Sequence, residues 1–130
     1  KLQFVRLALL RGDLPAARTA RGPAAIIGMS CYDDIARAER AAAEGASYLA
    51  FGAFFPSGTK PLARRADPAL LRAATRFGLP RVAIGGISPD NGESLVAAGA
   101  DLLAVIGAVF DAPDPAAAVR AFHSCFEAKP

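Results

Sequence analysis

The sequence predicts an α/β protein with the fold of a TIM (β/α)8 barrel, of which only the later βα units are present. Every clear strand candidate is a continuously apolar run, which is typical of parallel strands buried on both faces. Strand and helix candidates alternate along the chain, as in βαβ units. Residues 42–50 are echoed by residues 96–104, which lie 54 positions later (96 minus 42). Such near-equivalent units favour a barrel over an open sheet.

The first part of the chain contains an undecided element, a strand and two helices. Residues 1–11 are apolar and fit either a strand or a short helix. After the punctuation at 12–15, residues 16–21 predict a short helix, and residues 23–29, bounded by Gly and Pro, predict a buried strand. Ser30 stands three residues before Asp33, which resembles a capping box. The helix it would open covers 35–44 and ends at Gly45.

The middle of the chain is a strand that ends in a polar loop. Apolar residues 48–55 predict the strand, and residues 56–60 combine proline, glycine, two hydroxyls and Lys60. Asp67 followed by Pro68 is a strong start signal for a helix over 69–77. The remaining elements are a strand at 81–84, a helix capped by 88–90 and ended by Gly99, a strand at 101–106, and a last helix over 115–127.

Length conflicts with a closed barrel. The 130 residues are enough for one domain, 1–130, with four strand candidates and an undecided fifth. An eight-stranded barrel takes about 200 residues or more, and a half barrel leaves sheet edges exposed. We therefore expect a chain that lacks the first strands, either as a piece of a longer polypeptide or as part of an assembly. The sequence does not decide whether the chain forms a homo-oligomer.

Composition restricts the classes of partner. The chain is 53% apolar with a net charge of +3, and no apolar run reaches the roughly 20 residues of a membrane helix. The N-terminus has arginines among its apolar residues and no small-residue cleavage site. Cys31 and Cys125 form no CxxC pair and predict free thiols in a reducing cytoplasm. The basic cluster at 60–65 lacks interleaved aromatics, so we expect a small phosphorylated ligand rather than nucleic acid.

Three loops are candidates for one anion site. Gly85-Gly86 and Ile106-Gly107 follow strands, where barrel loops often hold a phosphate through backbone N–H groups. The alternative is a pair of tight turns without a ligand. The neighbouring Ser57, Gly58, Thr59 and Lys60 favour phosphate, with Lys60 as a clamp for a phosphate or pyrophosphate leaving group.

Asp13 and Ser30 each fit two roles. Asp13 is a good helix cap, and it is also a carboxylate at a strand end that could share a Mg²⁺ ion. Ser30 fits a helix cap or a ligand contact equally well. His123 falls deep in the last helix candidate, which predicts a surface or packing role and not acid–base catalysis. No nucleophile–base pair and no metal-ligand cluster is recognisable in the sequence.

Taken in order, these motifs resemble the thiamine-phosphate synthase (thiamine-phosphate pyrophosphorylase) family. The resemblance runs from about 12 to 122 and rests on residues 12–15, 27–32, 51–61, 83–87 and 98–101. It implies a TIM barrel that joins 4-amino-2-methyl-5-hydroxymethylpyrimidine diphosphate to a thiazole phosphate and releases pyrophosphate, with Mg²⁺. It also implies that Asp13 binds Mg²⁺, Ser30 contacts the pyrimidine substrate and Lys60 is the catalytic residue that holds pyrophosphate. Thiazole phosphate would be bound by Ser57, Gly58, Thr59, Gly86, Ile106 and Gly107.

The sequence departs from the family pattern on one side of the site. The family's Gln-x-Arg-x-Lys strand and its Asn-Asp pair are not found, and Gly107 stands where the family often has Ser. The first two gaps fall on the pyrimidine-diphosphate half. Two alternatives follow: a thiazole tautomerase, whose members carry a His where this chain has Ala53, and a non-catalytic barrel that binds thiazole phosphate.

Overall fold

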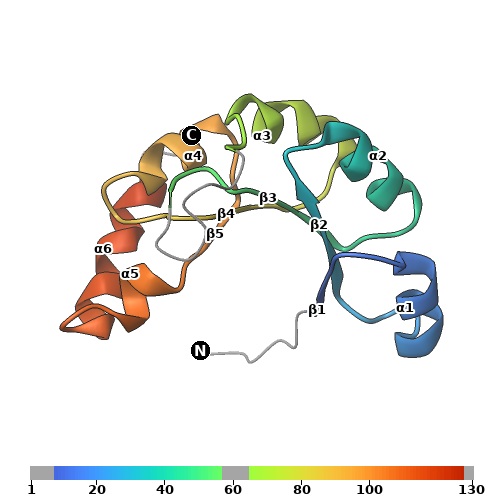
Figure 1. The fold of residues 1–130 in the computed structure, drawn as a ribbon, viewed down its shortest axis with the longest axis horizontal. Helices are drawn as coiled ribbons and strands as arrows, with labels where there is room; N and C mark the ends of the chain where they lie inside the picture. Colours follow the sequence, from blue (N-terminus) through green and yellow to red (C-terminus); the bar gives the residue numbers. More distant parts are fainter. Residues whose placement is uncertain (1–7, 57–64, 128–130) are drawn as a thin grey trace.

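The computed structural model describes residues 8–56 and 65–127, and its centre is a five-stranded parallel sheet. Each strand pairs with the next one along the chain, in the order β1-β2-β3-β4-β5. The strands are β1 (Ala8–Leu10), β2 (Ile27–Tyr32), β3 (Tyr48–Phe51), β4 (Arg81–Ile84) and β5 (Leu102–Ala104). Figure 1 shows them in a curved row with α2, α3 and α4 arching along one side. This sequential, one-sided arrangement is an arc of a (β/α) barrel, as predicted.

Aspartate side chains cap the starts of α1 (Leu14–Arg21) and α6 (Pro115–Glu127). The other helices are α2 (Ile35–Ala43), α3 (Ala69–Ala73) with its 3₁₀ extension η1 (Ala74–Phe77), α4 (Gly92–Ala98) and α5 (Gly107–Phe110). Asp13 Oδ1 accepts a hydrogen bond from Ala16 N at 3.0 Å, and Asp114 Oδ1 accepts one from Ala117 N at 3.1 Å. Both carboxylates satisfy N–H groups that a helix start leaves without partners.

The two faces of the sheet have different surroundings. Side chains alternate between the faces along each strand, and one set packs under the helices in the main core. The largest fully buried side chains of this core come from both strands and helices: Leu14, Ile27, Leu49, Phe51, Leu71 and Leu95. The other set forms a smaller cluster on the inner face, with Tyr48, Ala50 and Val82 packed against Ile84 and Ala104. At the two edges Leu9 is 43% and Leu102 is 50% exposed.

The internal echo corresponds to a repeated link at the amino ends of the strands. Ser47 N donates to Ile27 O at 2.7 Å, while Ile27 N donates to Ser47 Oγ at 2.9 Å. In the second copy Asp101 N donates to Arg81 O at 2.9 Å, while Arg81 N donates to Asp101 Oδ2 at 3.0 Å. Each small polar side chain therefore ties the start of its own strand to the start of the preceding strand.

Several predicted boundaries differ from the structure. The undecided N-terminal element is a strand where the structure describes it, β1. The second strand begins at Ile27 rather than at 23, since Ile26 is exposed and Ile27 is the residue that pairs with β1. The third strand ends at Phe51 rather than at 55, because Phe54 N and Phe55 N donate to Ile84 O and Gly85 O outside the strand ladder.

Two cap predictions are wrong. Ser30 caps no helix, since it lies within β2, and Asp34 caps α2 by accepting hydrogen bonds from Ala36 N and Arg37 N. The helix predicted to begin at 88–90 starts at Gly92, because Asn91 Oδ1 accepts from Ser88 N and shapes a turn there. Helix α5 was not predicted, as one turn is too short to give a periodic pattern.

Candidate active site

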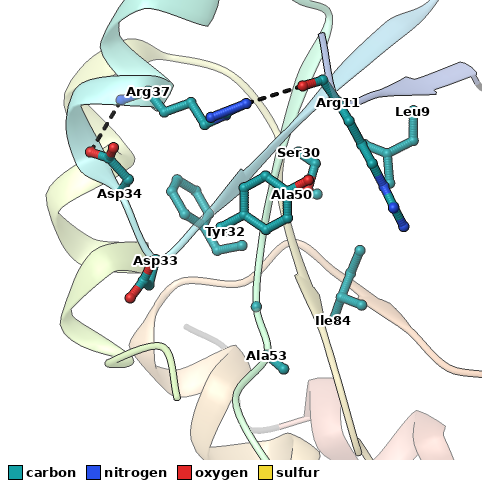
Figure 2. A pocket seen from close by; sticks show the side chains of 12 residues that line it. Leu9, Arg11, Ser30, Tyr32, Asp33, Asp34, Arg37, Ala50, Ala53 and Ile84 are labelled. Atoms are coloured by element: carbon teal, nitrogen blue, oxygen red, sulfur yellow. Dashed lines mark hydrogen bonds between the residues drawn. The ribbon is translucent and has the colours of Figure 1, made fainter. Parts of the chain in front are cut away.

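A cavity of about 580 Å³ opens at the carboxyl ends of β1, β2 and β3 (Figure 2). Its volume is within the usual range for small-molecule sites. Its wall combines apolar residues from the sheet with two arginines, two aspartates, a serine and a tyrosine. The lining residues are Leu9, Arg11, Ser30, Tyr32, Asp33, Asp34, Arg37, Ala50, Phe51, Gly52, Ala53 and Ile84.

Strand alternation decides which side chains reach the cavity. Ser30 pairs with Ala50 across β2 and β3, and both lie on the inner face with Ile84. Leu9 pairs with Gly28, which puts Leu9 on the same face at the edge of the sheet. Arg11 follows two positions after Leu9 and continues this face beyond the end of β1. The resulting floor is apolar, and its rim carries Ser30 and Arg11.

Tyr32 enters the cavity because β2 is irregular at its end. The register with β3 shifts between Ser30 and Tyr32, and Tyr32 has a positive φ of 52°. A positive φ at a non-glycine residue costs about 1–3 kcal/mol, and such residues are concentrated at functional sites. The Tyr32 carbonyl accepts a hydrogen bond from Gly52 N at 3.0 Å, which holds the distorted strand end against β3. The Tyr32 side chain remains 42% exposed.

Arg37 connects the parts of the rim. Its Nη2 donates to Arg11 O at 3.0 Å, and its guanidinium carbon lies 5.1 Å from the centre of the Tyr32 ring. That separation is within the range of a cation–π contact. Arg37 belongs to the first turn of α2, which Asp34 caps, so its position is fixed by the helix. Figure 2 shows these contacts as a chain from Asp34 through Arg37 to Arg11.

The cysteine beside this rim is buried, and its thiol is hard to ionise. Cys31 is buried on the helix-facing side of β2. Burial is the main cause that raises the pKa of its thiol to about 11, and the nearby Arg37 only partly opposes that shift. The thiol therefore stays protonated at neutral pH, where a thiolate would be needed for reactivity. Cys31 and Cys125 are both free, as predicted.

Gly85 and Gly86 bring the loops after β3 and β4 together. Both have positive φ, 106° and 61°. A Cβ on Gly85 would lie 2.5 Å from the Ala53 Cβ, and a Cβ on Gly86 would lie 2.6 Å from Pro56 O. The close neighbours of these two glycines are residues 53–56 of the loop after β3. That contact places Phe55 and Pro56 directly beside Gly86.

The other predicted site residues fall in three places. Ser30 lines the main cavity, whereas Asp13 lines a smaller cavity of about 320 Å³ with Pro15, Arg40 and Glu44. Ile106 is 78% exposed and immediately precedes α5, whose first residue is Gly107. Ile84 and Ala104 are paired across β4 and β5, and Gly86 and Ile106 each follow one member of this pair by two residues.

Four of the predicted site residues lie outside the described residues: Ser57, Gly58, Thr59 and Lys60. His123 is exposed on α6, as predicted.

Sequence reasoning missed Arg11, Tyr32 and Arg37. For Arg11 a signal existed, since a charged residue directly follows the apolar run 7–10. The contacts of Tyr32 and Arg37 depend on a strand irregularity that the sequence does not reveal. Within residues 8–56 and 65–127, no group of three or more His, Cys, Asp or Glu side chains could hold a metal ion. No helix in this part of the chain is long and apolar enough to cross a membrane.

The family model described as thiamine monophosphate synthase matches residues 5–109. The chain belongs to this family. Among the family's curated proteins, the thiamine-phosphate synthase of Xanthomonas campestris pv. campestris strain 8004 is 59% identical over 115 residues, covering 88% of this chain and 56% of that protein. The enzyme of the same name from Methylobacillus flagellatus is 55% identical over 122 residues, covering 94% of this chain and 58% of that protein.

A solved structure of the thiamine phosphate pyrophosphorylase from Pyrococcus furiosus agrees with this assignment. It superposes with a TM-score of 0.79 at 33% identity, over 92% of this chain and 58% of that one. The family resemblance predicted from the motifs is thus confirmed. This thiamine monophosphate synthase family chain spans little more than half the length of the relatives it matches.

Proposed function

We propose that the chain contributes the described βα units to a thiamine-phosphate synthase, a transferase of thiamine biosynthesis. Its substrates would be 4-amino-2-methyl-5-hydroxymethylpyrimidine diphosphate and thiazole phosphate, and its products thiamine phosphate and pyrophosphate. The observation that carries the proposal is the 59% identity to a thiamine-phosphate synthase over 88% of this chain. The cavity at the carboxyl ends of the strands supports it, because barrel enzymes place their active sites at that end.

The pyrimidine substrate fits the main cavity. The apolar floor of Ala50 and Ile84 suits a planar ring, and the Ser30 hydroxyl on the same face can contact its polar atoms. We assign thiazole phosphate to the neighbouring loops, to Ser57, Gly58, Thr59, Gly86, Ile106 and Gly107. The contact between Gly86 and the backbone of Phe55 and Pro56 supports this grouping, since it brings two of these loops together.

The reaction exchanges one bond for another. The bond between the pyrimidine methylene carbon and the diphosphate oxygen breaks, and its electron pair leaves with pyrophosphate. The thiazole nitrogen supplies the electron pair for the new carbon–nitrogen bond, so no oxidant or reductant is needed. The protein's contribution is to align the nitrogen with the methylene carbon and to stabilise negative charge on the leaving group. We assign the second task to Lys60.

Asp13 is the residue we propose to hold Mg²⁺. Its carboxylate is exposed and supplies hard oxygen donors, of which Oδ1 already accepts the Ala16 N–H. Mg²⁺ commonly takes one or two carboxylates together with substrate phosphates, so a single protein ligand here is compatible. The cavity that Asp13 lines adjoins the main one, since Arg11 and Arg37 line both. Bound Mg²⁺ would supply positive charge to the diphosphate.

The alternatives are less well supported. Ala53 lines the cavity and offers no ionisable group where a tautomerase carries His, and the curated relatives compared above are named as synthases. The two buried free thiols favour a reducing compartment, and we place the enzyme in the cytoplasm.

Calorimetry with each substrate alone tests the proposal in the full-length protein. A synthase binds the pyrimidine diphosphate in the presence of Mg²⁺ and also binds thiazole phosphate. A protein that binds thiazole phosphate and ignores the pyrimidine diphosphate is a non-catalytic binder, and that result would contradict the proposal.

A further inference from the structure

We propose that Arg11 binds the diphosphate group of the pyrimidine substrate. The inference rests on the proposed function and adds a residue that determines which substrate group the rim recognises. Arg11 is the first residue after β1 and lines the main cavity. Its side chain belongs to the inner face, two positions beyond Leu9. In Figure 2 it extends from its carbonyl toward the side of the cavity that carries Leu9 and Ile84.

The backbone of Arg11 is fixed while its guanidinium is available. Arg37 Nη2 donates to the Arg11 carbonyl at 3.0 Å, and α2 holds Arg37 in place. Arg11 is exposed. Within the described part of the chain, no hydrogen bond or ion pair involves the Arg11 guanidinium. A cation at a cavity rim with a defined backbone position and no partner among the described residues is suited to an external anion.

The neighbouring charges point to the same residue. Asp34 uses its carboxylate to accept hydrogen bonds from Ala36 N and Arg37 N at the start of α2. Arg37 already donates Nη2 to the Arg11 carbonyl and lies over the ring of Tyr32. The Arg11 guanidinium makes no such contact among the described residues, so all of its N–H donors can face an incoming ligand.

The chemistry of the anion follows from the guanidinium group. Its planar fork of N–H donors matches the oxygens of a phosphate and can bind two of them at once. The cavity places this fork above an apolar floor formed by Leu9, Ala50 and Ile84. A ligand with a flat ring and a diphosphate tail matches both features, with the ring on the floor and the tail at the rim.

The test is the affinity of the full-length protein for inorganic pyrophosphate, with and without Mg²⁺, measured by calorimetry. We expect Arg11→Gln to weaken binding about tenfold, a loss expected for one charge-assisted contact, and Arg11→Lys to weaken it less. Arg120→Gln is the matched control, because Arg120 is an exposed arginine on α6 that lines neither of the two cavities. It should change the affinity less than twofold. Unchanged binding in Arg11→Gln, or an equal loss in both variants, would overturn the inference.

Steady-state kinetics separate a substrate contact from a structural role. In Arg11→Gln we expect the KM for the pyrimidine diphosphate to rise about tenfold, with the KM for thiazole phosphate and the melting temperature unchanged. A parallel rise of both KM values, or a lowered melting temperature, assigns Arg11 to structure and refutes the proposal. Wild-type protein that makes no thiamine phosphate contradicts the proposed function itself. An active Arg11→Gln variant with normal pyrophosphate affinity contradicts the Arg11 inference alone.

Discussion

Single residues decide how the loops of the site meet, and Gly86 is the clearest case. Its φ of 61° lies in the left-handed region, and a Cβ there would lie 2.6 Å from Pro56 O and 2.8 Å from Phe55 O. Both nearby atoms are backbone, which cannot rotate out of the way. Position 86 therefore needs glycine for two reasons: its φ is positive, and the backbone of Phe55 and Pro56 leaves no room for a Cβ.

We expect Gly86→Ala to destabilise the protein by about 2 kcal/mol or more, since the left-handed conformation alone costs about 1–2 kcal/mol. The contact with Pro56 adds to that cost. The variant should also raise the KM for thiazole phosphate several-fold by displacing the loop after β3. Urea unfolding and initial rates measure the two effects.

Gly78→Ala is the control for backbone strain. Gly78 has a similar φ of 69°, but nothing lies within 4 Å of an added Cβ. The Gly78→Ala variant should lose about 1 kcal/mol of stability, and its KM for thiazole phosphate should not change. If the two variants behave alike, the packing of Gly86 against Pro56 does not matter for the site.

At the scale of elements, some helix starts were predictable from local chemistry, whereas strand pairing was not. The Asp67-Pro68 and Asp114-Pro115 starts place α3 and α6 correctly, because capping uses only neighbours in sequence. The predicted start of β2 and the predicted end of β3 were wrong, because the true boundaries, Ile27 and Phe51, depend on pairing with the adjacent strands. Ser30 is the instructive error: its spacing to Asp33 resembles a cap, but the strand continues and Asp34 caps the helix.

The repeated link between strand starts carries a prediction for stability. Arg81 joins Asp101 in an ion pair at 3.4 Å and donates to Leu71 O and Thr75 Oγ1. We expect Asp101→Ala to cost about 2 kcal/mol, as it removes a charged acceptor, and Ser47→Ala to cost about 1 kcal/mol.

Both links lie at the amino ends of the strands, opposite the cavity, so neither variant should alter KM. Asp90→Ala, at an exposed position before α4, is the control and should change the unfolding free energy by less than about 0.5 kcal/mol. A Ser47→Ala variant as stable as the wild type would show that the echo is a sequence repeat without an energetic role.

On the scale of the whole molecule, the sequence predicted the class of fold because its signals are distributed. Continuous apolar strands, glycine after helices and the echo at 42–50 and 96–104 all agree with a row of βα units. The rim of the cavity was not predictable in the same way. Arg11, Tyr32 and Arg37 come together through the register shift at the end of β2 and through a helix-to-strand contact, and neither has a sequence signature.

The chain covers only part of a barrel. The described strands cover an arc whose inner face is exposed at Leu9 and Leu102, while the chain covers only 56% and 58% of the two curated relatives.

The proposed function is tested by whether the full-length protein forms thiamine phosphate. Purified protein is incubated with both substrates and Mg²⁺, and the product is separated and quantified together with the pyrophosphate released. We expect the two products in equal amounts, and neither product when one substrate is omitted. A folded protein that binds both substrates and forms no thiamine phosphate would contradict the proposed function.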